Sequence, residues 1–93
     1  MKYDVIRTTK FRRELKKMIK RGADISKLET VVNILASGEA LPPQYHDHAL
    51  TGNLNGLRDC HITSDWLLLY TIQDDVLVLT LTRTGTHSDL FGE

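Results

Sequence analysis

The chain has 93 residues, of which 41% are hydrophobic and 26% charged, so it has the composition of an ordinary globular protein with one small core. Its length predicts a single domain over residues 1–93. No apolar stretch approaches the roughly 20 residues needed to cross a bilayer. The first residues resemble no signal peptide, and the lone Cys60 excludes an internal disulfide. We therefore expect a cytoplasmic protein with no membrane partner.

The net charge of zero conceals a strong asymmetry along the chain. Residues 1–30 contain ten Lys and Arg against four acidic residues, whereas the remainder contains two Arg against eight acidic residues. A basic segment of this kind favours a polyanion or an acidic protein as partner, and a solvated helix face is the alternative.

A short strand at residues 3–6 and two helices are predicted in the first half of the chain. Residues 8–9 offer an N-cap, and one apolar stripe then recurs at helical spacing over about 12 residues, formed by Phe11, Leu15, Met18 and Ile19. Gly22 is placed to end this helix. Residues 26–29 fit a capping box for a second helix that ends near Gly38. The short link between the helices predicts an antiparallel pair.

Three strands with tight connections are predicted in the second half, at residues 57–62, 66–72 and 76–82. In the first of them Asp59 and His61 share one face, whereas Cys60 lies on the other and is expected to be a buried strand residue. The element order predicts an α+β fold, in which an N-terminal strand and a helix pair precede an antiparallel meander and the helices cover one sheet face.

The residues that invite a chemical interpretation are four histidines, all outside the predicted helices: His46, His48, His61 and His87. They can be scattered surface residues, or a metal site built on His46-Asp47-His48, although this spacing matches no strong zinc motif. They can also act on a phosphodiester, because one imidazole can accept a proton while another donates one. In that interpretation Arg83 binds the phosphate. Trp66 or Phe91 stacks on a base, and core packing is the alternative for both aromatic residues.

The chain resembles the YafQ-type toxins of the RelE/ParE superfamily of bacterial toxin–antitoxin systems over essentially its whole length. The order of elements agrees, and the resemblance rests on four segments whose combination is specific: Asp47-His48-Ala49-Leu50-Thr51-Gly52, Gly56-Leu57-Arg58-Asp59-Cys60-His61, Asp65-Trp66-Leu67-Leu68-Leu69-Tyr70 and Arg83-Thr84-Gly85-Thr86-His87-Ser88-Asp89-Leu90-Phe91-Gly92.

The resemblance implies a ribosome-dependent endoribonuclease that cuts mRNA in the decoding site without a metal or other cofactor. The RNA's own 2′-OH attacks, and the product is a 2′,3′-cyclic phosphate. The family's catalytic positions fall on His48, His61, Asp65 and His87. Its phosphate-contacting arginine falls on Arg83 and its aromatic position on Phe91, and Trp66 is a site wall or a structural residue. No family position corresponds to His46.

Roles for these residues follow from the resemblance as hypotheses. His87 is expected to be the general acid for the 5′-oxygen, and His48 or His61 the base for the 2′-OH. Asp65 is expected to orient a histidine or to help in proton transfer, and Phe91 to stack on or near the scissile nucleotide. The basic face of the first helix is expected to bind ribosomal RNA through Lys10, Arg12, Arg13, Lys16, Lys17, Lys20 and Arg21.

The resemblance also implies a cognate antitoxin that silences the toxin, with operator DNA bound only through the toxin–antitoxin complex. Two other classes of function stay open. One is a ParE-like toxin that inhibits DNA gyrase by protein contact, although the histidine cluster argues against it. The other is a simple RNA- or DNA-binding module with incidental histidines.

Overall fold

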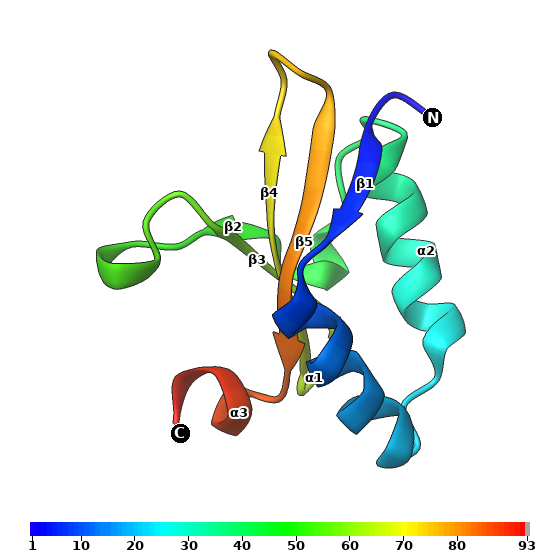
Figure 1. Cartoon of the computed structure of the whole chain (residues 1–93), viewed down its shortest axis with the longest axis vertical. Coiled ribbons are helices and arrows are strands. Elements are labelled where there is room, and N and C mark those ends of the chain that lie inside the picture. The colour runs from blue at the N-terminus through cyan, green and yellow to red at the C-terminus, as the bar shows by residue number, and fades with distance from the viewer. Residues whose placement is uncertain (93) are drawn as a thin grey trace.

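The computed structural model describes residues 1–92, which form one mixed sheet with two long helices against one of its faces (Figure 1). The sheet contains the strands β1 (Asp4–Arg7), β2 (His48–Ala49), β3 (Arg58–Thr63), β4 (Trp66–Gln73) and β5 (Val78–Gly85). The helices are α1 (Thr9–Lys20), α2 (Ile25–Ala36) and α3 (His87–Phe91), and two short 3₁₀ turns are η1 (Pro43–Tyr45) and η2 (Gly52–Leu54). The predicted α+β class is confirmed.

The strand order is β1-β5-β4-β3-β2, so β1, the first strand of the chain, lies at one edge of the sheet beside β5, the last strand. The predicted meander is present as antiparallel β3, β4 and β5, and the two-residue β2 adds to it beside β3. The N-terminal strand β1 pairs parallel with β5, from Asp4 beside Val78 to Arg7 beside Leu81. The sheet is therefore mixed, because β1 pairs parallel with β5 while all the other strand pairs are antiparallel.

The helix pair forms where the apolar periodicity predicts it, and its two N-caps explain the boundaries. Thr8 caps α1, since its side chain accepts a hydrogen bond from the N–H of Phe11 at 3.0 Å. The expected capping box at Ser26 is wrong: α2 is capped by Asp24, whose carboxylate accepts from both the N–H and the hydroxyl of Ser26. An aspartate at this position offers the better acceptor, so α2 begins at Ile25.

The core lies between the two long helices and one face of the sheet. Its buried side chains come from α1 and α2 on one side and from β3, β4 and β5 on the other: Phe11, Leu15, Met18, Leu28, Val31, Leu35, Cys60, Ile62, Trp66, Leu68, Tyr70, Leu79 and Leu81. Cys60 is fully buried, as expected, and burial raises the pKa of its thiol. The opposite face of the sheet is thereby left without a long helix, although Leu67 and Leu69 on it are also fully buried.

The last strand lies further along the chain than the predicted 76–82. Val76 and Leu77 are exposed in the connection from β4, and Leu77 turns the chain with a φ of 54°. Pairing with β4 carries β5 on to Gly85, where α3 follows at once. The segment after Arg83 is thus a strand end and a short helix, rather than an irregular tail. Among residues 1–92, no helix is long and apolar enough to span a membrane.

Candidate active site

The candidate site lies at the end of the sheet where β5 passes into α3. Antiparallel pairing sets His48 beside Asp59, and Asp59 beside Leu69, while His61 lies beside Leu67. Paired residues share a face and side chains alternate along a strand, so these polar side chains all rise from the face opposite the long helices. The buried Leu67 and Leu69 form the floor beneath them.

Three imidazole rings form a continuous row on this face. The ring centroid of His61 lies 5.2 Å from that of His46 and 5.3 Å from that of His87, at interplanar angles of 52° and 82°. His46 comes from the segment after η1, His61 from β3 and His87 from the start of α3. The fold therefore brings together side chains separated by 41 residues of sequence.

Asp65 fixes the orientation of His87. One carboxylate oxygen accepts from the backbone N–H of His87 at 3.0 Å and lies 2.6 Å from its ring Nδ1. These two hydrogen bonds, the backbone one foremost, lower the pKa of Asp65, so the carboxylate is ionised and can only accept. The Nδ1 of His87 consequently carries a hydrogen, and its Nε2 is the nitrogen left for chemistry.

His48 has its tautomer set by a backbone carbonyl. Its Nδ1 lies 2.7 Å from the carbonyl oxygen of His46, and because a carbonyl can only accept, this nitrogen carries the hydrogen. Its Nε2 faces the carboxylate of Asp59 at 3.6 Å. The side chain of Asp59 is only 5% exposed, and burial raises the pKa of this carboxyl against the opposing effect of nearby His48, His61 and His87.

His61 is half-buried in the middle of the row. Burial is the largest influence on it and lowers the pKa of its ring, while the neighbouring Asp59 acts in the opposite direction. A lowered pKa favours the neutral imidazole at neutral pH, which is the form a general base requires. The site thus places His61, whose lowered pKa favours the neutral ring, beside His87, whose ring is oriented by the carboxylate of Asp65.

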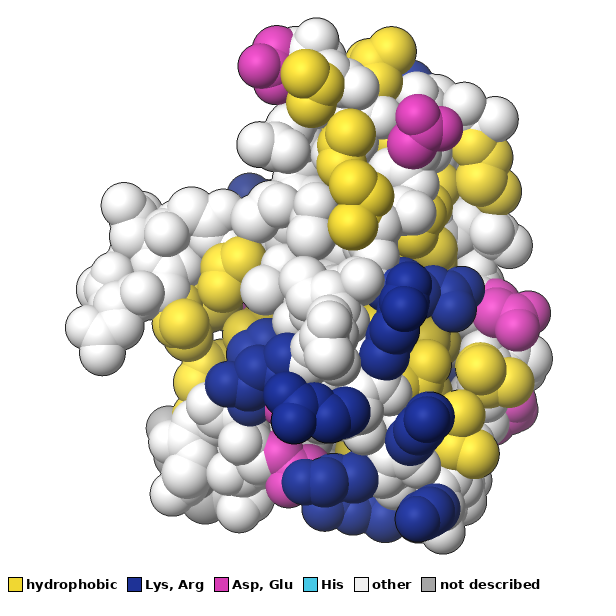
Figure 2. Space-filling model, in the orientation of Figure 1, with side chains coloured by type: hydrophobic (Ala, Val, Ile, Leu, Met, Phe, Trp, Pro, Cys, Tyr) yellow, Lys and Arg dark blue, Asp and Glu magenta, His cyan; other side chains and the backbone are white. Residues whose placement is uncertain are grey.

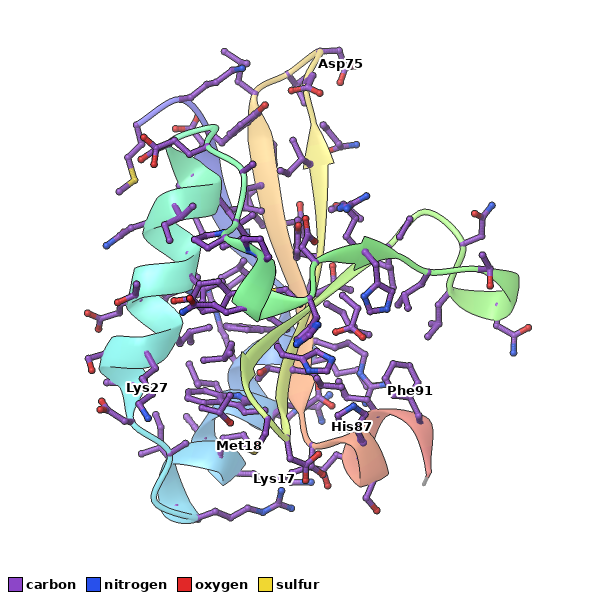
Figure 3. All side chains as sticks on the ribbon, turned by 180° about the vertical axis from the view of Figure 1, so that it is seen from behind. Lys17, Met18, Lys27, Asp75, His87 and Phe91 are labelled. Carbon is purple, nitrogen blue, oxygen red and sulfur yellow. The ribbon has the colours of Figure 1, made fainter. Side chains whose placement is uncertain are left out.

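Phe91 and Trp66 occupy different positions with respect to this row. Phe91 follows His87 by one helical turn, and Figure 3 shows both side chains on the side of α3 that faces β2 and β3. Trp66 is 3% exposed and lies in the helix-side core, where its indole N–H donates to the hydroxyl of Thr84 at 2.8 Å. The alternative that Trp66 stacks on substrate is therefore wrong, because no face of its ring is open.

Arg83 lies in the same register row as Asp59 and Leu69, but its guanidinium turns to α1. It donates to the carboxylate of Glu14, at 2.6 Å in the shortest contact, and the same carboxylate lies 3.3 Å from the N–H of Thr84. This N–H lies beyond the end of β1, so Glu14 takes the place of a strand partner there. The hydrogen bonds of Arg83 thus go to Glu14 and not to the histidines.

The basic face of α1 surrounds this ion pair. The seven residues expected to bind ribosomal RNA are all exposed, and Figure 2 shows Lys and Arg side chains gathered over α1 on a face where no histidine is visible. A groove of about 350 Å³ opens here beside Lys10, Arg13 and Lys17. Arg21 contacts α3 instead, because its guanidinium pairs with the carboxylate of Asp89 at 2.6 Å. This contact lowers the pKa of Asp89 to about 2.

Sequence reasoning left out two residues of the site, His46 and Asp59. The alternation of β3 already places Asp59 on the face of His61, and this periodicity was the available signal. No such signal exists for His46, because its place in the row depends on a left-handed backbone conformation (φ 50°, ψ 40°) after η1. His48, His61, Asp65, His87 and Phe91 are gathered as expected, with His48 placed beside Asp59 rather than within the row.

The fold defines a small α+β protein with a carboxylate–imidazole cluster on one face of its sheet. Comparison with known proteins identifies the class: the family of YafQ bacterial toxins of type II toxin–antitoxin systems matches residues 3–92. The chain belongs to this family, and it is a type II toxin.

Individual relatives agree over nearly the full length. The chain is 37% identical over 90 residues to the mRNA interferase toxin YafQ of Escherichia coli (strain K12), covering 96% of each protein. The crystal structure of the E. coli DinJ–YafQ complex matches with a TM-score of 0.88 at 36% identity, covering 97% of this chain and 99% of that one. A metal-bound toxin from Helicobacter pylori matches with a TM-score of 0.89 at 40% identity, covering 96% and 99%.

Proposed function

We propose that this toxin is an endoribonuclease that cuts mRNA on the ribosome by metal-independent acid–base catalysis, with the RNA's 2′-OH as nucleophile. Membership of the YafQ family and the 37% identity to an mRNA interferase support the endoribonuclease assignment. The observation that carries the mechanism is the Asp65–His87 pair 5.3 Å, ring to ring, from His61. Two imidazoles this close together can both reach one phosphodiester.

The reaction needs only proton transfers from the protein. His61, with its lowered pKa, takes the proton of the 2′-OH, and the 2′-oxygen forms a bond to phosphorus. The bond from phosphorus to the 5′-oxygen breaks, and this oxygen receives the proton held on Nε2 of His87. The products are a 2′,3′-cyclic phosphate and a free 5′-OH, and each proton transfer contributes roughly 10²–10⁴ in rate.

The other site residues support these two. His48 donates its Nδ1 hydrogen to the carbonyl of His46, which orients its ring so that Nε2 lies 3.6 Å from the buried carboxylate of Asp59. Phe91 stacks beside the scissile nucleotide, since it shares a helix face with His87. Arg83 contacts the phosphate once it exchanges Glu14 for RNA. No group of three or more His, Cys, Asp and Glu side chains among residues 1–92 is arranged to hold a metal ion.

Partners follow from the two faces of the molecule. The exposed basic residues of α1 bind ribosomal RNA through its phosphates, which leaves the histidine face free for mRNA. A cognate antitoxin binds the toxin in the cytoplasm, as the DinJ–YafQ complex supports, and operator DNA is bound only through that complex.

Mapping mRNA 5′ ends after brief expression tests the proposal. We expect discrete cuts within codons of translated messages, ending in 5′-OH and 2′,3′-cyclic phosphate groups. His87→Ala should abolish the cuts, whereas Ser88→Ala, a change at the next and exposed position of α3, should keep them. Full cutting by a folded His87→Ala variant would refute the acid role. Gyrase-linked DNA damage without mRNA cuts would instead favour the ParE-like class.

A further inference from the structure

A groove of about 470 Å³ opens beside the imidazole row, on the side away from α3. It is lined by Gln44, Tyr45, His46, His61, Thr63 and Ser64, and we call it the His46 groove. His61 belongs both to this groove and to the imidazole row. Anything bound in the groove therefore lies directly next to His61, the proposed base.

The groove has the chemistry of a surface that binds a single-stranded base. Single-stranded RNA is recognised by stacking of splayed bases on flat side chains, including His, and by hydrogen bonds to base edges. The exposed His46 supplies a flat ring, and Gln44, Thr63 and Ser64 supply polar groups around it. Among residues 1–92, no side-chain hydrogen bond engages these three polar side chains, so their donors and acceptors are free for a ligand.

The backbone that carries His46 has a defined conformation before any ligand arrives. Pro42 and Pro43 limit the backbone leading into η1, and Tyr45 packs against the core. His46 then adopts a left-handed conformation that is uncommon for a residue other than glycine. A backbone restrained in this way loses little conformational freedom on binding, which favours affinity.

The groove also continues toward a cation. A neighbouring hollow of about 360 Å³ shares Gln44, Tyr45 and Thr63 with it and extends to Lys27 and Thr30 on α2. Lys27 is exposed and lies on the side of the molecule seen in Figure 3, together with His87. A chain of RNA that leaves the imidazole row through the groove would meet this positive charge at its next phosphate.

We propose that the His46 groove is a nucleobase subsite for the nucleotide adjacent to the cut, with His46 as its stacking wall and Lys27 as a contact to the following phosphate. The proposal rests on the proposed RNA cleavage and adds to it a residue that stacks on the base. The polar rim of Gln44, Thr63 and Ser64 would then contribute to the sequence preference of cleavage.

A cross between protein variants and mRNA variants tests the subsite. Single-turnover cleavage is measured on ribosomes carrying mRNAs in which one nucleotide beside the mapped cut is abasic. Base stacking of this kind has a typical effect of roughly tenfold. In the wild type, removing the base at one of the two flanking positions should therefore raise the half-saturating toxin concentration about tenfold. His46→Ala should lose this sensitivity at that position alone, and His46→Phe should restore it, because a phenyl ring stacks but cannot carry a proton.

The outcomes distinguish failure of the subsite from failure of the proposed RNA cleavage. A wild type that cuts no mRNA refutes the proposed function itself. Normal cutting with equal sensitivity to abasic positions in wild type and His46→Ala refutes only the subsite. Loss of activity in His46→Ala that His46→Phe does not restore, with the thermal midpoint unchanged, also refutes it. Gln73→Ala, an exposed change at the far end of β4, is the matched control and should behave as wild type.

Discussion

Asp47 anchors the segment that carries His46 and His48, and its removal offers the most informative single perturbation. Its carboxylate accepts from the hydroxyl of Tyr70 at 2.5 Å and from the guanidinium of Arg58 at 3.2 and 3.3 Å. Both partners belong to the sheet, on β3 and β4. The two flanking histidines are thereby fixed relative to Asp59 and His61.

The magnitude can be worked out from the exposure of each partner. Tyr70 is 1% exposed, so Asp47→Ala leaves a buried hydroxyl without an acceptor, at a cost of about 1–3 kcal/mol. The Arg58 and Asp47 side chains are 41% and 23% exposed, so water screens their ion pair, which adds at most about 1 kcal/mol. We expect a total near 2 kcal/mol, and roughly a 10 °C fall in the melting temperature.

Tyr70→Phe provides the matched comparison. It removes the same hydrogen bond but leaves Asp47 paired with Arg58, so it should cost only about 1 kcal/mol. Cleavage of ribosome-bound mRNA, measured where both variants are folded, should fall at least tenfold for Asp47→Ala and much less for Tyr70→Phe. An Asp47→Ala variant with wild-type melting and wild-type cleavage would refute the anchor. If the two variants lose the same stability and both keep full activity, the contacts of Asp47 are purely structural.

Four further outcomes test the mechanism and the docking surface. Because burial lowers the pKa of His61, kcat/KM should stay high at pH 6.5 and fall only at lower pH, and an acidic limb above pH 6.5 would contradict its role as base. Dialysis against EDTA, with magnesium restored for the ribosome, should leave the cleavage rate within twofold of its starting value, and a loss rescued by a transition metal would overturn the metal-independent route. The double change Lys16→Glu and Lys17→Glu should weaken ribosome binding at least tenfold at low salt and flatten its salt dependence, whereas an unchanged salt slope would exclude α1 as the docking surface. Glu14→Gln should release Arg83 for phosphate and lower the half-saturating toxin concentration by severalfold, and an increase in that concentration would show that Glu14 holds Arg83 in its working position.

The sequence predicts the elements well because periodicity and capping are local. The stripe from Phe11 to Met18 is buried as a helix face, and the alternation of β3 separates Cys60 from Asp59 as expected. Boundaries were less accurate where a distant partner decides them. Pairing with β4 extends β5 beyond Thr82, and no local pattern in the chain reports that pairing.

The sequence indicates which residues belong to the candidate site better than it indicates how they contact one another. Family motifs indicate His48, His61, Asp65 and His87, but they do not say which carboxylate orients which ring. That assignment depends on α3. Its first residue, His87, donates its backbone N–H to Asp65, which lies in the turn between β3 and β4. The position of His46 depends on one backbone angle, and the contact of Arg83 with Glu14 depends on where β1 ends.

Three supports of α3 explain how a site can include a short helix near the end of the described residues. A helix of five residues is too short to be stable alone. Its capping box closes its first turn, and the contact of Asp89 with Arg21 ties it to α1. Asp65 then holds His87 from the sheet side. Since α1 also carries the basic face, the helix that we propose as the ribosome-binding surface also contacts α3, which carries the proposed general acid, so docking and catalysis would share a rigid element.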